Sequence, residues 1–221
     1  MSGRVRYVMM MSVDPAYFDD TEEEGIKITE TFTDLGGFER WLHDELCEKN
    51  DIISGEFIGI FSAKKEFRGL IRVPARFRRN NLTGVVFPAA EHAFTEKEEG
   101  LIRGTIVSHN HPSDFPFVYD EILWARDLNV IESRIVTADW IYSVRPRAAG
   151  WPSWETIGRA NAEIDSELSV HNCVARSHSD PAWLHGRYEQ LSRRAGFEYS
   201  REKYLPDKAG VLAVAGEKQP T

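Results

Sequence analysis

The chain has 221 residues, of which 42% are hydrophobic and 28% are charged, and its formal net charge at pH 7 is −8. This composition is typical of a globular protein with one or two domains, and the acidic balance argues against a surface that binds nucleic acid throughout. No apolar run approaches the roughly 18 residues of a membrane span and the N-terminus has no signal-peptide layout, so we expect a cytoplasmic protein that does not enter membranes.

In chain order, residues 1–25 form an N-terminal segment with an acidic end, which we expect to be partly mobile. Alternating residues over 26–32 predict a strand, and Asp34 is a suitable N-cap for a helix that runs to about residue 49. The apolar run over 52–62 predicts a buried strand, which Glu56 interrupts. A carboxylate in a buried strand needs a partner or a metal site, so Glu56 is a candidate functional residue; the alternative is a surface residue at a strand end.

A basic stretch follows that strand. Such a stretch is commonly the solvated face of a hairpin, and the functional alternative is a contact for an acidic partner protein or a phosphate backbone. Between positions 64 and 79 it contains one acid, Glu66, and seven bases, which are Lys64, Lys65, Arg68, Arg72, Arg76, Arg78 and Arg79.

The remaining pattern predicts a mixed sheet with helices on both faces. Strands are expected at 69–73 and 84–88, and the pair Thr95 and Glu98 is a capping-box pattern that predicts a helix over about 96–103. The segment 104–113 (GTIVSHNHPS) predicts a strand that is followed by a helix over about 119–129 and by a hairpin of strands at 134–137 and 140–144. Residues 26–150 therefore read as one α/β domain, 151–208 as a helical extension with helices near 153–169 and 181–195, and 209–221 as a polar tail.

His109 and His111 lie two residues apart at the end of the predicted strand. Because residues i and i+2 of a strand point to the same face, both imidazoles can converge on one metal ion. A single histidine beside a strand is more often a satisfied polar residue, but the pair favours a metal site. The chain has two cysteines, Cys47 and Cys173, so a zinc ion would need histidine and carboxylate ligands.

Glu56 in the sequence EFIGIFS, followed 53 residues later by His109 and the segment HNHPS, resembles the JAMM/MPN (JAB-like) metalloprotease superfamily. This superfamily includes deubiquitinating isopeptidases, RadC-like proteins and phage and bacterial JAMM-like domains. The resemblance covers about residues 50–147 and implies a cytidine-deaminase-like mixed sheet flanked by helices. It also implies a zinc ion held by His109, His111 and a carboxylate, with Glu56 as the general base. The substrate would be a peptide or isopeptide bond in a protein, such as a ubiquitin-like or phage-related protein.

The third ligand departs from the family pattern. Family members have an Asp ten or eleven residues after the second histidine, where this chain has Glu121 and Ile122, and Asp120 lies one residue earlier. Helical register favours Glu121 and residue type favours Asp120. Adjacent helix residues point about 100° apart, so we do not expect both to bind the ion.

The serine that family members carry three residues before the Asp is also missing. Its position falls on Val118 or Phe117, neither of which can donate a hydrogen bond to an oxyanion. Ser113 and Tyr119 lie in the same loop and are the candidates to replace it.

The leading hypothesis is therefore a zinc-dependent JAMM-like peptidase or isopeptidase. The alternative is a catalytically weak or inactive JAMM-fold module for binding or assembly, which the missing serine and the displaced Asp favour. A weaker third hypothesis, suggested by the basic stretch, is a DNA-associated role by analogy with the RadC-like branch.

Overall fold

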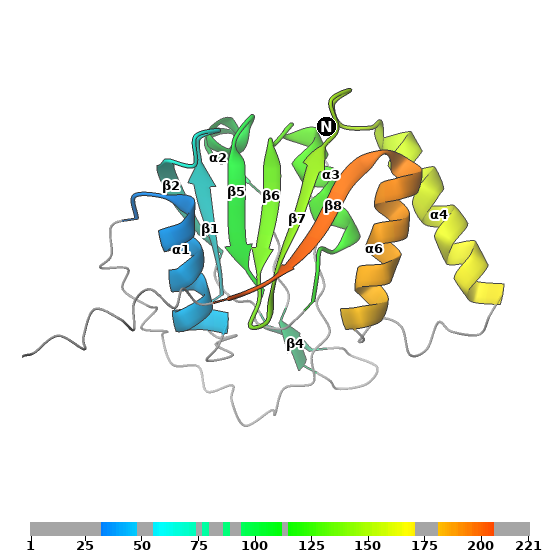
Figure 1. Ribbon diagram of the computed structural model, residues 1–221, viewed down its shortest axis with the longest axis horizontal. Helices are drawn as coiled ribbons and strands as arrows, with labels where there is room; N and C mark the ends of the chain where they lie inside the picture. The colour runs from blue at the N-terminus through cyan, green and yellow to red at the C-terminus, as the bar shows by residue number, and fades with distance from the viewer. Residues whose placement is uncertain are drawn as a thin grey trace, which may run out of the picture.

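A six-stranded mixed sheet forms the centre of the computed structural model, which describes residues 32–47, 55–73, 77–79, 86–88, 94–111, 115–170 and 181–205 (Figure 1). β5 and β6 are parallel, whereas the other neighbouring strands are antiparallel. The strand order is β2 (Phe67–Val73), β1 (Glu56–Phe61), β5 (Ile106–Asn110), β6 (Glu132–Val136), β7 (Trp140–Pro146) and β8 (Phe197–Lys203). Two short antiparallel strands, β3 (Phe77–Arg79) and β4 (Val86–Pro88), form a second sheet.

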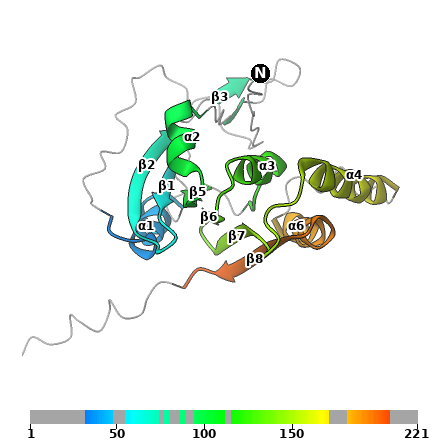
Figure 2. The same ribbon diagram turned by 90° about the horizontal axis from the view of Figure 1, so that it is seen from above.

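Helices pack on both faces of the central sheet. One face packs against α1 (Leu35–Leu42), which continues into the π-helical segment η2 (His43–Cys47). α2 (Glu96–Ile102) and α3 (Tyr119–Asp127) lie on the opposite face (Figure 2). Side chains of α4 (Trp154–Val170) and α6 (Pro181–Ala195) share a core with α3 and with strands β6 to β8. The arrangement confirms the predicted α/β class with a mixed sheet flanked by helices.

The alternation of side chains in β1 explains how it joins two cores. Phe57 and Phe61 pack with α1, whereas Ile58 and Ile60 pack with α2 and α3. Gly59 lies on the α1 side, where a Cβ atom would overlap the ring of Phe38. The close approach of α1 to this strand therefore requires glycine.

The predicted helix starts are confirmed by their hydrogen bonds. Asp34 Oδ1 accepts a hydrogen bond from the backbone N–H of Gly37 at 2.8 Å. Thr95 Oγ1 accepts from the N–H of Glu98 at 3.3 Å, and a carboxylate oxygen of Glu98 accepts from the N–H of Thr95 at 2.7 Å. These side chains satisfy amide groups that have no partner within the first helical turn.

The basic stretch lies largely along the β1–β2 hairpin and its continuation. Lys64 and Lys65 are exposed in the turn, and Arg68 and Arg72 are exposed on β2, which is an edge strand of the sheet. Lys65 has a φ of 66°, in the left-handed region that tight turns use. Four of the seven bases are thus solvated residues of a hairpin.

The sequence predicted helices alone for residues 151–208, but the structure adds a strand there. β8 pairs with β7 through seven residue pairs, from Trp140–Lys203 to Pro146–Phe197. In β8 only Phe197 and Tyr199 are apolar, and polar residues are usual on an edge strand, so the apolar alternation is too short to predict a strand. The segment from α4 to β8 is consequently part of the same sheet and core as the preceding residues.

Some predictions fall on parts of the chain outside the described residues. These are the segment 1–25, the strand expected over 26–32 apart from Phe32, the residue Cys173 and the tail 209–221. Among the helices that the structure describes, none combines the length and apolar character needed to cross a membrane. Phe32 is described, and its ring packs against the rings of Phe38 and Phe67.

An ionic network that is buried at Glu39 and partly buried at Arg134 and Glu132 ties α1 to the centre of the sheet. Arg134 on β6 binds both carboxylate oxygens of Glu39 on α1, at 2.6 and 3.1 Å, and one of Glu132 at 2.8 Å. Ser108 donates to Glu39 at 3.0 Å, and Ser143 donates to Glu132 at 2.7 Å. Burial raises the pKa of Glu132, but hydrogen bonds from Ser143 and Arg134 lower it further than burial raises it. Each of these charges therefore depends on the others for compensation.

We expect Arg134→Met to lower the free energy of unfolding by about 3–5 kcal/mol, because it leaves the buried Glu39 and the partly buried Glu132 without their cation. The double variant Glu39→Met/Arg134→Met should be more stable than Arg134→Met, since the unpaired charge on α1 is also removed. Urea unfolding at pH 7, followed by circular dichroism, measures both values. A loss under about 0.5 kcal/mol in Arg134→Met, the range of an ordinary surface substitution, would contradict the structural role of the network.

Candidate metal site

His109 and His111 point to the sheet face that carries α3. β5 ends at Asn110, and His111 follows with its N–H bonded to the carbonyl oxygen of Val136 at 2.9 Å. Val107, two residues before His109, packs in the core formed with α2 and α3, so His109 and His111 share that face. Both side chains are buried.

A carboxylate from α3 completes a three-residue cluster. Glu121 Oε1 lies 3.0 Å from His109 Nε2 and 3.0 Å from His111 Nε2, and the two Nε2 atoms are 3.3 Å apart. All three residues are at most 3% exposed. Two imidazole nitrogens and a carboxylate oxygen are donors that divalent transition metals accept, and in the described part of the chain this is the group of residues that could hold a metal ion.

Glu121 is held in place by the start of its own helix. It is the third residue of α3, and its Oε2 accepts a hydrogen bond from the N–H of Val118 at 2.7 Å. The first turn of a helix carries unpaired N–H groups and a partial positive charge, which favour a carboxylate there. One oxygen of Glu121 therefore caps the helix, while the other faces the histidines.

The orientation of His111 is also fixed. Its Nδ1 donates to the carbonyl oxygen of Phe115 at 3.1 Å, which directs Nε2 toward Glu121. His109 Nδ1 is buried and has no hydrogen-bond partner in the described residues. The Phe115 contact could not be predicted from the sequence, because a backbone carbonyl can come from any residue type.

Electrostatics keep the group charged in the absence of a metal. Burial lowers the pKa of His111, but the charge and hydrogen bond of Glu121, with a smaller effect of Glu56, raise it to about 9. Burial raises the pKa of Glu121, but His111 and His109 together bring it well below its ordinary value. An anionic carboxylate and a protonated imidazole thus compensate each other inside the protein.

The structure distinguishes the two carboxylates that the sequence left open. Glu121 joins the histidines, whereas Asp120 is partly exposed and outside the cluster. The pKa of Asp120 is raised by partial burial and by the neighbouring Glu121. Glu121 accepts from the N-cap N–H as the glutamate of a capping box does, but Val118 at the N-cap has no side-chain oxygen, so the sequence lacks the capping-box pattern.

The other predicted site residues have different outcomes. Glu56 is the first residue of β1, is half-buried and is near enough to raise the pKa of His111. It shares its face of the sheet with Ile58 and Ile60, which is the face of the two histidines. Ser113 lies outside the described residues. The hydroxyl of Tyr119 is beside α4, where a Cβ atom added to Gly158 would lie 3.5 Å from it.

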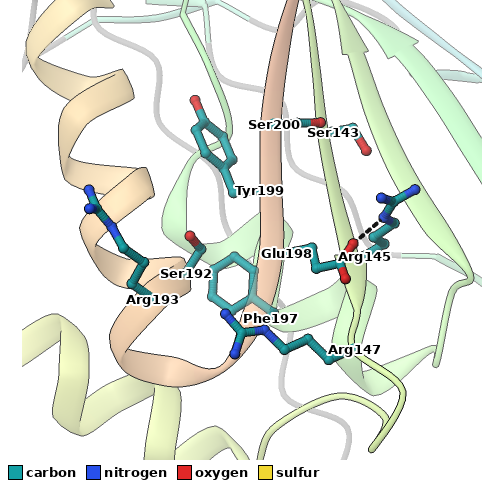
Figure 3. Close-up of a pocket in the computed structure, with 9 residues that line it drawn as sticks. All are labelled: Ser143, Arg145, Arg147, Ser192, Arg193, Phe197, Glu198, Tyr199 and Ser200. Carbon is teal, nitrogen blue, oxygen red and sulfur yellow. Dashed lines mark hydrogen bonds and ion pairs between the residues drawn. The ribbon is translucent and has the colours of Figure 1, made fainter.

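An open cavity of about 340 Å³, whose lining residues are drawn in Figure 3, lies at the other end of the sheet from the histidines. The histidines lie at the C-terminal end of β5, whereas the cavity includes Arg145 and Arg147 at the C-terminal end of β7, which runs in the opposite direction. Its lining comes from both faces of the edge strand β8, and Glu198 forms an ion pair with Arg145 at 2.5 Å. The cavity is therefore separate from the His109–His111–Glu121 cluster.

Comparison with known proteins adds no assignment: no family model, curated protein or solved structure matches the chain.

We expect the protein to bind about one divalent transition-metal ion per chain through this cluster. Loss of a residue that only supports the ligands typically weakens metal binding about 10–100-fold. Glu121→Gln removes a ligand and should weaken binding by more than that. Asp120→Asn, which neutralises the adjacent carboxylate, should bind as the wild type does. Elemental mass spectrometry and competition with a chromophoric chelator measure stoichiometry and affinity. Equal loss in the two variants would contradict the assignment of Glu121.

Metal binding should also depend on pH. Because the pKa of His111 is raised to about 9 in the metal-free protein, the ring carries a proton at pH 7 that the metal must displace. The affinity should therefore fall about tenfold for each pH unit below 9. Chelator competition at several pH values between 7 and 9 tests this, and a flat profile would show that His111 does not lose a proton on binding.

Proposed function

We propose that the chain is a zinc-dependent hydrolase of the JAMM/MPN type that cleaves peptide or isopeptide bonds in a protein substrate. The observation that carries the proposal is the convergence of His109 Nε2, His111 Nε2 and Glu121 Oε1 on the sheet face that also bears Glu56. A metal alone would be compatible with many functions. A metal site with a nearby carboxylate outside its ligand set matches the parts that hydrolysis requires.

The residues fit zinc. Zinc–ligand distances of about 2.0–2.1 Å in a tetrahedral site place neighbouring ligand atoms about 3.3 Å apart. The three separations here are 3.0, 3.0 and 3.3 Å. Three protein ligands and one open position are typical of catalytic zinc sites, whereas structural sites have four protein ligands.

Each residue of the site would have a separate role in hydrolysis. A zinc ion bound by this cluster would supply Lewis-acid activation of water and of the scissile carbonyl. Glu56, which is not in the ligand group, would accept the proton of the attacking water and then deliver it to the leaving amine. The carbonyl of Phe115 would hold the His111 ring in the tautomer that leaves Nε2 free to coordinate.

We expect Glu56→Gln to lower kcat by about 10²–10⁴-fold, the usual contribution of a general base, without loss of zinc or of the fold. Glu96→Gln, which neutralises an exposed acid on α2, is the matched control and should keep wild-type activity. The assay uses the zinc-loaded protein with a panel of ubiquitin-like conjugates and peptides. Wild-type rates in Glu56→Gln would rule out its assigned role.

A second candidate is a binding or assembly module with the same fold and little catalysis. The observation that favours it is the hydrophobic character of Phe117 and Val118, which stand where family members carry the serine donor, and Phe117 is fully buried in the core. Absence of cleavage by the zinc-loaded wild type across the panel, together with a captured partner that also binds the His109→Ala/His111→Ala variant, would favour the module.

A further inference from the structure

Asn110 lies between the two histidines but points to the opposite face of the sheet. It is the last residue of β5 and is fully buried. Successive side chains of a strand alternate, so Asn110 shares the α1 face with Ile106, which packs with Phe57. A buried amide needs hydrogen-bond partners, and none can come from the metal cluster on the other face.

Both polar atoms of the Asn110 side chain bind the backbone of the segment that enters β1. Its Oδ1 accepts a hydrogen bond from the N–H of Phe57 at 2.8 Å. Its Nδ2 donates to the carbonyl oxygen of Gly55 at 3.2 Å. These two backbone groups belong to the peptide bonds on either side of the Glu56 Cα atom.

The side chain thereby replaces a missing section of the β-ladder. Register pairing between β1 and β5 runs from Phe61–Ile106 to Ile58–His109 and extends no further. On its other side Glu56 is paired with Val73 of β2. Gly55 has a φ of 81°, so the backbone changes from a left-handed to an extended conformation immediately before Glu56.

We propose that Asn110 is a positioning residue that clamps the two peptide groups flanking Glu56 and so directs its carboxylate to the face of His109 and His111. The inference rests on the proposed function for the role of Glu56, but the clamp itself is independent of any activity. Residues 109–111 would then serve both parts of the site. His109 and His111 would be metal ligands on one face, and Asn110 on the other face would hold the backbone of Glu56, the proposed general base.

The test compares Asn110→Ala with the wild type in two measurements. The first is amide hydrogen exchange of Phe57 in the metal-free protein, followed by NMR. This exchange should be at least about fivefold faster in the variant, the factor expected from the loss of one ordinary hydrogen bond. The second is hydrolysis by the zinc-loaded protein, in which kcat should fall about 10–100-fold with KM changed less than about twofold, because the ligands are intact and the base is displaced.

Ser108→Ala is the matched control. Ser108 is on the same strand and the same face and is fully buried, and among the described residues its side chain bonds to Glu39 and not to β1. It should leave the exchange of Phe57 and kcat at wild-type values. If Asn110→Ala does not fold, Asn110→Thr keeps a similar volume but has a shorter side chain with one hydroxyl in place of the two amide atoms, and should likewise speed the exchange of Phe57 and lower kcat.

The outcomes separate the clamp from the proposed function. Unchanged exchange of Phe57 in Asn110→Ala overturns the clamp, and accelerated exchange with unchanged kcat overturns its positioning role. Zinc content equal to that of the wild type is expected in every case and excludes loss of the ligands as the cause. If the wild type itself cleaves nothing, the proposed function fails, while the exchange of Phe57 still decides whether Asn110 holds this segment.

Discussion

The structure depends on the burial of four consecutive polar side chains, residues 108–111, at the end of the central strand. A buried polar group without a partner is costly, so each of these must be satisfied by another element. Alternation along the strand sends two of them to each face. On the α1 face, Ser108 bonds to Glu39 and Asn110 bonds to the backbone of β1. On the α3 face, His109 and His111 both bond to Glu121. The helices on the two faces are thereby fixed relative to one strand.

The two faces use their charges differently. On the α1 face, Arg134 is a permanent cation that binds both oxygens of Glu39, so the network is closed without an ion. On the α3 face, the carboxylate of Glu121 faces imidazoles, whose charge depends on pH and whose nitrogens can release protons. The first network is suited to stability. The second can exchange its protons for a metal ion, which the first cannot do.

Local patterns predicted much of this arrangement, because strand alternation and helix caps act over a few residues. The convergence of His109 and His111 follows from their spacing, the cap at Asp34 from one residue type, and the cap at Thr95 from its pairing with Glu98. Choices that depend on tertiary structure were not predictable in the same way. The selection of Glu121 over its neighbour depends on where α3 begins, and a shift of one residue rotates a side chain by about 100°. β8 is defined by its pairing with β7, not by its own weak pattern.

The geometry of the cluster argues for a cation at its centre. A structural triad of this kind would need to place protons between Glu121 Oε1 and two Nε2 atoms that are also within 3.3 Å of each other. Without a metal ion, the proton retained by His111 compensates the carboxylate of Glu121, and the same Glu121 oxygen also lies within hydrogen-bond distance of His109. A divalent ion satisfies all three donor atoms at once. The position of Glu56 then gives the site a carboxylate that is outside the ligand group yet close enough to act on His111, which is the element that a purely structural metal site does not need.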